Sequence, residues 1–215
     1  MPPLDRNYQS PSAINFLNAI TGVLSQQPEP APEGRRASAV LIPLLEVDGH
    51  WHVILTKRAA HLRHHAGQIS FPGGAIEPGE TAADAALREA HEEIDLHPDQ
   101  VTVKGHLPSV LTTANYHIAP VLGVVKSSPV LTPQPEEVDR ILLEKLHPLL
   151  MRRHHRQEPR QHNGIDYKTW VIDHDKEYIW GATAKLIVQW SALMDEEWVA
   201  SQGADNQGDD NLGAA

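Results

Sequence analysis

Three glutamates with helical spacing are the residues of this chain whose types and positions best suit chemistry. Glu89, Glu92 and Glu93 stand at positions i, i+3 and i+4, which share one face of a helix. In an isolated helix each like-charge pair costs roughly a few tenths of a kcal/mol, a cost that a hard cation between the carboxylates removes. Mg²⁺ and Mn²⁺ prefer carboxylate oxygens and keep several waters. The spacing therefore predicts a Mg²⁺ or Mn²⁺ site with positions open to phosphate oxygens and to an attacking water.

A glycine-containing loop precedes these glutamates. Gly73 and Gly74 allow the backbone to approach a ligand closely, so we expect Gly73 to contact the substrate and the carbonyl of Gly74 to be a further metal ligand. Pro78 and Gly79 supply a tight turn before the helix. Two glutamates on an exposed helix more often form a solvated surface, and two adjacent glycines alone indicate only a turn. The combination at fixed separations favours a site.

The glutamates must be positioned by a helix, and residues 81–94 are the strongest helix prediction in the chain. Thr81 is predicted to cap the N-terminus, and Asp84 completes a capping box in which Asp replaces Glu. Apolar residues at helical spacing predict a narrow buried stripe made of Ala83, Ala86, Leu87, Ala90 and Ile94. We expect the glutamates to lie opposite this stripe or at its edge.

The middle of the chain predicts one α/β domain. Residues 39–45 and 53–55 have the composition of strands, and Asp48-Gly49 between them indicates a hairpin. Further strands are predicted at residues 101–107, 118–125, 167–173 and 178–180, and a second helix at residues 182–198.

The two ends of the chain differ from this middle part. Residues 12–24 predict a short helix docked on the domain, and residues 26–34 contain three prolines and predict a linker. We therefore divide the chain into an N-terminal helix and linker at residues 1–35, a domain at residues 36–200, and a disordered acidic tail at residues 201–215.

Composition excludes several classes of function. The chain of 215 residues has a formal net charge of −10, which disfavours non-specific nucleic-acid binding. A small phosphorylated substrate is still compatible, because a bound metal inverts the local field. The absence of cysteine excludes disulfides, thiolate catalysis and cysteine zinc sites. No secretory signal and no apolar run long enough to span a bilayer are visible, so we expect a cytoplasmic protein without membrane association.

The separations around the glutamates resemble the Nudix box. Gly74, five residues, Glu80, seven residues and then residues 88–96 follow the pattern glycine, x5, glutamate, x7, Arg-Glu-U-x-Glu-Glu-x-Gly-U, where U is a bulky aliphatic residue. Two positions depart from the pattern. Ala90 is smaller than usual, and Asp95 replaces the final glycine. Aspartate tolerates the left-handed backbone that a helix C-terminus often needs, though less well than glycine.

This resemblance implies a Nudix fold, a mixed β-sheet sandwiched between helices. It implies that Mg²⁺ or Mn²⁺ is bound by Glu89, Glu92, Glu93 and the Gly74 carbonyl. It also implies that Glu80 holds Arg88, which makes Arg88 part of the catalytic machinery. The general base stays open between Glu92, Glu93 and a carboxylate from another loop. The candidates in another loop are Glu136 and Glu137, for which an exposed turn is an equally good interpretation.

A second motif lies just upstream. Residues 54–59, Ile-Leu-Thr-Lys-Arg-Ala, are followed by Arg63, Gly67 and the Phe-Pro-Gly-Gly of residues 71–74. This resembles the motif of the coenzyme A pyrophosphatase branch of Nudix enzymes, Leu-Leu-Thr-x-Arg-(Ser/Ala)-x3-Arg-x3-Gly-x3-Phe-Pro-Gly-Gly, with Ile54 as the one difference. The resemblance implies hydrolysis of the pyrophosphate bond of coenzyme A or a derivative, giving 3′,5′-ADP and 4′-phosphopantetheine or its acyl form.

The residue types in this second motif suit such a substrate. Arg58 and Arg63 are predicted to bind it, because the planar guanidinium makes bidentate contacts with phosphate. They belong to a basic segment that also contains Lys57, His61, His64 and His65. For the three histidines we favour a solvated loop.

Two other functions stay open. One is a Nudix pyrophosphatase for another nucleoside diphosphate derivative, such as ADP-ribose, NADH or an oxidised nucleotide. The other is a catalytically silent Nudix module that senses a nucleotide, against which the intact Glu89, Glu92 and Glu93 argue. The number of metals and the oligomeric state, including a homodimer, are not determined by the sequence.

Overall fold

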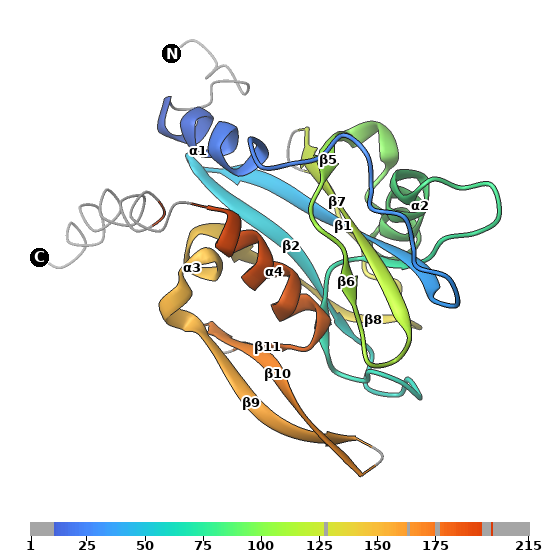
Figure 1. The fold of residues 1–215 in the computed structure, drawn as a ribbon. Coiled ribbons are helices and arrows are strands. Elements are labelled where there is room, and N and C mark those ends of the chain that lie inside the picture. The colour runs from blue at the N-terminus through green and yellow to red at the C-terminus, as the bar shows by residue number, and fades with distance from the viewer. Residues whose placement is uncertain (1–10, 127–128, 163, 175–176, 195–198, 200–215) are drawn as a thin grey trace, which may run out of the picture.

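The computed structural model describes residues 11–126, 129–162, 164–174, 177–194 and 199 (Figure 1). Its helices are α1 (Pro11–Thr21), α2 (Ala82–Ile94), α3 (Leu146–Leu150) and α4 (Ala182–Leu193), with short 3₁₀ turns at Pro98–Gln100 and Arg152–His154. Its strands are β1 (Arg36–Val47), β2 (His50–Arg58), β3 (Ile69–Ser70), β4 (Gly73–Ala75), β5 (Val101–His106), β6 (Val110–Leu111), β7 (Tyr116–Val125), β8 (Val138–Lys145), β9 (His155–His162), β10 (Ile165–His174) and β11 (Glu177–Trp180).

The strands form one large mixed sheet and one small sheet. The eight-stranded sheet has the order β3-β2-β1-β7-β5, with β4 paired to β1, β6 to β7 and β8 to β2. β1 and β7 run parallel, whereas β1 and β2 are antiparallel. The three-stranded sheet is antiparallel in the order β11-β10-β9. The residues of the two predicted motifs lie mostly on β2, on β4 and on α2, the helix that follows β4.

Two apolar clusters hold helices on both faces of the large sheet (Figure 1). The α2 side is built from small residues, such as Ala85 and Ala90, packed against Leu41 and Ile54. The other side contains α1, α3, α4 and the small sheet, with Trp190 of α4 fully buried. The predicted fold, a mixed sheet between helices, is confirmed.

The first hairpin shows how local sequence fixes the sheet. Val47 pairs with His50, so Asp48 and Gly49 form the two-residue turn. Both have positive φ, 51° and 80°, as a type I′ turn requires, and this is why Asp-Gly is favoured there. The N–H of Gly49 also donates to the carboxylate of Glu46 at 2.6 Å. The predicted hairpin is confirmed.

Both ends of α2 are closed by the residues that the sequence indicated. Thr81 accepts a hydrogen bond from the Asp84 N–H, and the Asp84 carboxylate accepts one from the Thr81 N–H. Asp95 adopts the left-handed conformation at φ 57°, and its N–H donates to His91. The Leu96 N–H then donates to Ala90, which completes a Schellman-type end. Aspartate thus takes the conformation for which glycine is usual.

The buried face of α2 differs from the predicted stripe. Its buried residues are Ala82, Ala85, Ala86, Ala90, Glu93 and Ile94. Ala83 and Leu87, which were predicted to be buried, are only half-buried. Of the two predicted positions for the glutamates, opposite the stripe or at its edge, Glu93 takes the edge and faces the sheet. The alanines make this possible, because their small side chains bring the helix close to β1.

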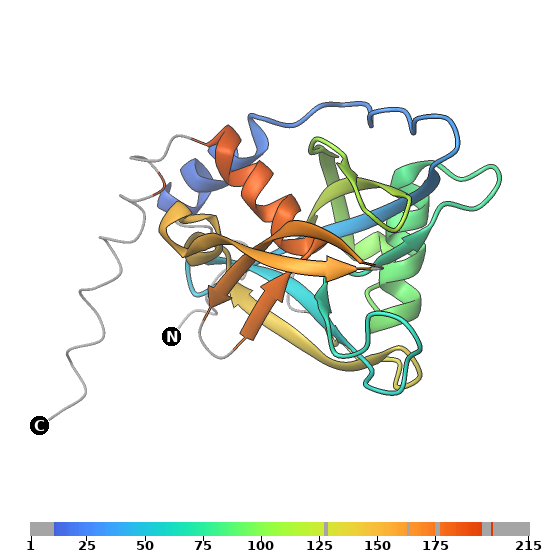
Figure 2. The same cartoon turned by 60° about the horizontal axis from the view of Figure 1, so that its bottom comes forward.

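The N-terminal part packs on the domain. Phe16 and Ile20 of α1 are 5% and 0% exposed and belong to the larger apolar cluster. The helix ends at Thr21, three residues earlier than predicted. The following segment runs along the outside of the fold toward the start of β1 (Figure 2), and Ser25 pairs with His106 of β5 on the way. Residues 1–10 and the predicted tail at residues 201–215 lie outside the described residues.

The other predicted elements are found at their places, and several were missed. The predicted strands correspond to β1, β2, β5, β7, β10 and β11. The second helix is described as α4 up to Leu193, and residues 195–198 of its predicted extension lie outside the described residues. Strands β8 and β9 were not predicted. β9 is polar and contains Pro159, which is tolerated because β9 is an edge strand.

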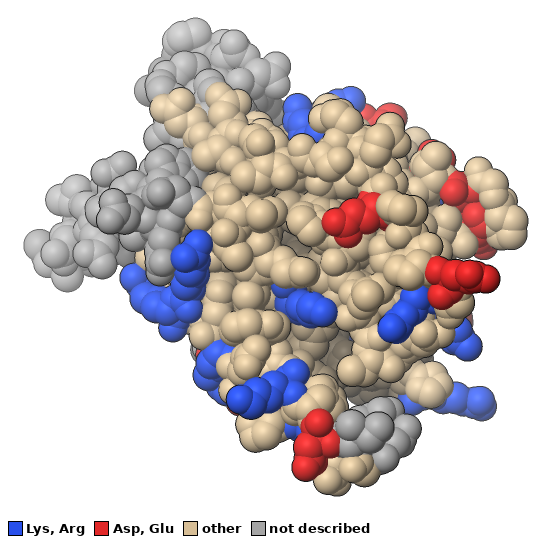
Figure 3. All heavy atoms as spheres, in the orientation of Figure 1, with Lys and Arg blue, Asp and Glu red and all other residues tan. Residues whose placement is uncertain are grey.

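Charged side chains are spread over the described surface. On the face drawn in Figure 3, Lys and Arg side chains lie in separate small groups, so that face has no broad basic surface among its described residues. No helix in the described ranges is long and apolar enough to cross a membrane.

Candidate active site

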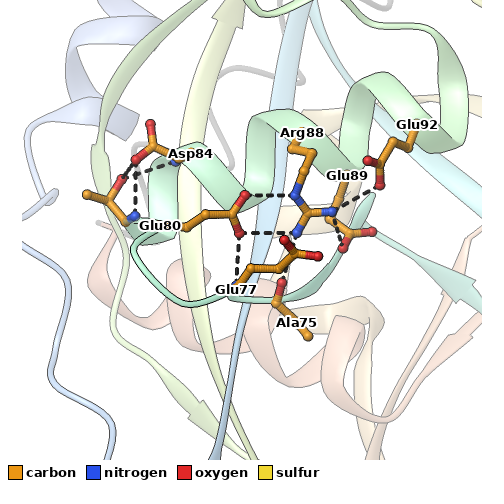
Figure 4. A network of polar contacts seen from close by, with 8 residues as sticks. Ala75, Glu77, Glu80, Asp84, Arg88, Glu89 and Glu92 are labelled. Carbon is orange, nitrogen blue, oxygen red and sulfur yellow. Dashed lines mark hydrogen bonds and ion pairs between the residues drawn. The ribbon is translucent and has the colours of Figure 1, made fainter.

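Arg88 of α2 stands at the centre of an acidic network (Figure 4). Its guanidinium donates to Glu80 at 2.8 and 3.2 Å, to Glu89 at 2.9 Å and to Glu92 at 3.0 Å. It also donates to the carbonyl of Ala75 in β4 at 3.0 Å. The expected contact between Glu80 and Arg88 is therefore present, and the network ties the loop, β4 and the helix together. The hydrogen bond from Arg88 lowers the pKa of Glu80, while Glu80 raises the pKa of Arg88.

Glu93 is the most buried of the three predicted metal ligands. Its side chain is 3% exposed, compared with 17% for Glu89 and 57% for Glu92. Burial raises the pKa of Glu93 to about 8, and repulsion from Glu89 and Glu137 acts in the same direction. A hydrogen bond from the backbone of Gly73 and the nearby charge of Arg58 oppose this rise only in part. The Oε2 atom of Glu93 is buried and has no hydrogen-bond partner among the described residues.

The two glycines of β4 have different neighbours. A Cβ on Gly74 would lie 2.4 Å from Oε1 of Glu89, so the absence of a side chain leaves the space that this carboxylate fills. A Cβ on Gly73 would lie 2.3 Å from the carbonyl oxygen of Ala39, which is backbone of β1. Gly74 therefore makes room for a carboxylate, and Gly73 allows β4 to pair closely with β1. The predicted ligand roles of both glycines stay predictions.

A loop from another part of the chain brings a further carboxylate to this region. The N–H of Thr132 donates to Ile94 and that of Gln134 to Glu93, so the loop satisfies carbonyls at the end of α2. Glu137 follows, and its charge acts on both Glu89 and Glu93. Its carbonyl accepts a hydrogen bond from Ala59, next to the end of β2. Glu137 is therefore close to the carboxylate group, whereas Glu136 contributes a backbone carbonyl to His61 at 3.1 Å.

The two predicted substrate arginines have different surroundings. Nη1 of Arg58 lies 3.6 Å from Oε1 of Glu93, a pairing that the sequence did not indicate. A register shift between Lys57 and Arg58, where β2 pairs with β8, accompanies this placement. Arg63 is exposed and makes no hydrogen bond or ion pair with any described residue. The structure thus brings Arg58 to the carboxylates and leaves Arg63 on the surface loop.

The donor set fits a hard divalent cation. Oxygen atoms of carboxylates are the ligands that Mg²⁺ and Mn²⁺ prefer, and Glu93 has a buried oxygen with unused bonding capacity. Within the described ranges, no three acidic, histidine or cysteine side chains are arranged so that they could hold a metal ion by themselves. Mg²⁺ commonly takes only one or two carboxylates and completes its shell with water and phosphate. Glu89, Glu92 and Glu93, with Glu137 nearby, are therefore the residues that would hold such an ion.

The family model that matches the chain is that of the NUDIX domain, over residues 35–164. An uncharacterized Nudix hydrolase named NudL from Enterobacter sp. (strain 638) is 36% identical over 154 residues, which are 71% of this chain and 80% of that protein. A NudL from Shigella flexneri serotype 5b (strain 8401) is 32% identical over 84% of this chain and 93% of its own length. Nudix hydrolase 3 from Caenorhabditis elegans is 45% identical over 100 residues, which are 46% of this chain and 42% of that protein.

One solved structure is similar over about half of the chain. A Nudix hydrolase from M. smegmatis, RenU, matches with a TM-score of 0.46 and 25% identity, over 52% of this chain and 71% of its own. The domain match covers more than half of the 215 residues, and the NudL relatives are similar over most of their length. The chain therefore belongs to the Nudix hydrolase family.

Proposed function

We propose that this Nudix hydrolase splits the diphosphate bond of coenzyme A or a derivative of it. The observation that carries the proposal is the meeting of two sequence motifs at one carboxylate. Arg58 and Gly73 come from the upstream motif, and both contact Glu93 of the Nudix box. Two residues of the motif that resembles the coenzyme A branch therefore lie beside a carboxylate of the motif that suits diphosphate hydrolysis.

The reaction consumes one water. The water oxygen bonds to one phosphorus of the diphosphate, the bond from that phosphorus to the bridging oxygen breaks, and the leaving phosphate departs with both electrons of the broken bond. A bound Mg²⁺ or Mn²⁺ neutralises charge on the phosphate oxygens. With coenzyme A the products are 3′,5′-ADP and 4′-phosphopantetheine.

The chain's own residues have separable tasks in this scheme. Glu80 and Arg88 fix the carboxylates of Glu89 and Glu92 relative to β4. The proton of the water passes to a carboxylate, for which Glu92, Glu93 and Glu137 are the candidates. Glu137 is supported by its charge interaction with Glu93 and by its position on a loop that is fastened to α2.

A diphosphate panel tests the proposal. Coenzyme A, ADP-ribose and NADH are each incubated with the protein at fixed Mg²⁺, and the products are identified by mass spectrometry in ¹⁸O-labelled water. We expect coenzyme A to give 3′,5′-ADP and 4′-phosphopantetheine, with one ¹⁸O atom in one of the two. Acyl and oxidised coenzyme A, compared in the same assay, establish which derivative is preferred.

Two results would overturn the proposal in different ways. Hydrolysis of ADP-ribose or NADH without hydrolysis of coenzyme A would show that the substrate is another nucleoside diphosphate derivative. No hydrolysis of any of these diphosphates by folded protein, together with binding of one of them, would favour the nucleotide-sensing module instead.

A further inference from the structure

Arg58 is held in place by its backbone and not by its side chain. Its N–H donates to Gln68 at 2.9 Å, and its carbonyl accepts a hydrogen bond from Gly67 at 3.1 Å. The register shift between Lys57 and Arg58 interrupts the regular pairing of β2 with β8, and such irregularities redirect side chains. The guanidinium lies beside the buried carboxylate of Glu93.

The contact between Arg58 and Glu93 is incomplete on both sides. The 3.6 Å from Nη1 to Oε1 is too long for a hydrogen bond, although the two charges attract. The Nε of Arg58 is buried without a partner among the described residues, and so is Oε2 of Glu93. Each group therefore has unused bonding capacity that another ligand can satisfy.

Arg88 provides the contrast within the same site. All three of its guanidinium nitrogens donate to acceptors at 2.8–3.2 Å, and these acceptors come from the loop, β4 and α2 (Figure 4). Moving Arg88 would break several short hydrogen bonds together, whereas moving Arg58 breaks none that the structure describes at its guanidinium. Of the two arginines, Arg58 is the one that is free to change partner.

We propose that Arg58 is a coupling residue that links cation binding to substrate binding. Without a cation its guanidinium lies beside Glu93, and it turns to a substrate phosphate oxygen when a divalent cation takes that carboxylate. Because the cation and the Arg58 guanidinium are like charges beside one carboxylate, substrate that draws Arg58 away strengthens cation binding, and the cation strengthens substrate binding by the same factor. The inference rests on the proposed diphosphate site but not on coenzyme A as the substrate.

The test measures Mn²⁺ affinity in the intact protein. Free Mn²⁺ is followed by electron paramagnetic resonance with and without α,β-methylene-ADP, a diphosphate that is not hydrolysed, after correction for the Mn²⁺ that this nucleotide binds by itself. In the wild-type protein we expect the nucleotide to tighten Mn²⁺ binding by at least about fivefold, the lower end of typical coupling. In Arg58→Met we expect Mn²⁺ alone to bind more tightly than in wild type. We expect the nucleotide to tighten Mn²⁺ binding by a clearly smaller factor than in wild type, because only the direct contact between phosphate and cation then couples the two ligands.

Lys57→Met is the matched control, because it removes the same charge one residue away. Lys57 makes no ion pair with a described carboxylate, so its variant should keep the wild-type coupling. Should Arg58→Met fail to fold, Arg58→Lys replaces it and should show reduced coupling, since an ammonium lacks the planar fork. Full coupling in the Arg58 variant, or equal loss of coupling in both variants, overturns the inference. A wild-type protein that binds no Mn²⁺ overturns the proposed metal site as well, whereas failure to hydrolyse coenzyme A leaves the coupling result unaffected.

Discussion

Arg88 binds Glu80 through two hydrogen bonds, from Nε to Oε1 at 2.8 Å and from Nη2 to Oε2 at 3.2 Å. Glu80 lies in the loop before α2, and its Oε2 also accepts a hydrogen bond from the Glu77 N–H. The pair therefore fixes the side of Arg88 that does not face Glu89 and Glu92. A change to Glu80 should therefore alter the positions of the Glu89 and Glu92 carboxylates, which bind the other side of the guanidinium.

Replacing Glu80 with glutamine tests this relationship. The amide keeps the size of the side chain and loses the charge that holds Arg88 in its bidentate geometry. We expect Mn²⁺ affinity or turnover to fall about 10–100-fold, the usual effect of changing a group that orients metal ligands. Calorimetric titration with Mn²⁺ and a diphosphate hydrolysis assay measure the two effects. Wild-type values in both assays would show that Arg88 is positioned by its other partners alone.

The two glycines of β4 give a matched pair of substitutions. In Gly74→Ala the new Cβ meets the end of the flexible Glu89 side chain, so the carboxylate moves and the fold is kept. We expect Mn²⁺ affinity to fall about 10–100-fold without a change in the urea midpoint. In Gly73→Ala the Cβ meets backbone atoms of Ala39 and Val40, so stability should fall by about 1–3 kcal/mol. Reversed effects would contradict these assignments.

The parts of the fold that the sequence predicted are those whose signals are local. The capping box at Thr81, the Asp48-Gly49 turn and the helical spacing of the glutamates each depend on residues a few positions apart. Strand β8 was missed because it pairs only with β2 at the edge of the sheet and leaves Leu143 47% exposed, so its pattern does not alternate. Strand β9 was missed because it is polar throughout.

In the site, too, the sequence predicted the local features and missed the contacts between distant residues. The grouping of Glu89, Glu92 and Glu93 follows from helix geometry, whereas the pairing of Arg58 with Glu93 joins residues 35 positions apart in sequence. Arg58 also stands at an irregularity in a strand pair that includes β8, which the sequence did not reveal. The burial of Glu93 was also missed, because a polar residue at the edge of an alanine stripe gives no sign of how the helix is rotated.

Glu93→Gln tests whether the buried carboxylate is a metal ligand. Burial already favours the neutral form of this carboxyl, so a neutral amide of the same shape should leave the fold intact. The amide is a weaker ligand for a hard cation, and we expect turnover to be abolished and Mn²⁺ binding to be lost. Thermal unfolding, Mn²⁺ titration and hydrolysis are compared with Glu33→Gln, which changes an exposed residue. Undiminished activity of the Glu93 variant would reject the metal assignment.

Two histidines should make stability depend on pH. His155 and His147 contact the carbonyls of Leu149 and Val199 at 2.8 and 2.7 Å. Burial lowers the pKa of both below the ordinary value of 6.5, so the unfolded chain binds more protons. Their contribution to stability is therefore complete above pH 6.5 and is lost as the pH falls through their folded pKa values.

Stability is compared between variants, because Glu93 also titrates. Its pKa is raised, so it changes the free energy of unfolding in the direction opposite to the histidines as the pH falls. His147→Gln with His155→Gln keeps donors for the two carbonyls and removes the titration. The urea midpoint is measured at pH 7.5 and pH 5.5, about one pH unit on either side of a histidine's ordinary pKa. We expect it to decrease less over this range in the double variant than in wild type. His64→Gln, on an exposed loop, serves as the control. An identical decrease in the double variant and in wild type would contradict the explanation.

Replacing Arg63 tests whether this residue binds a part of the proposed substrate other than the diphosphate. It is exposed and makes no described ion pair, so its guanidinium is available for the 3′-phosphate of coenzyme A without breaking an existing contact. A charge-assisted hydrogen bond contributes about 1.5–3 kcal/mol, so Arg63→Ala should raise the KM for coenzyme A by about 10–100-fold. Dephospho-coenzyme A lacks that phosphate, and its KM should be almost the same for variant and wild type. An equal rise for both substrates would place Arg63 at the diphosphate, and no rise for either would remove it from the site.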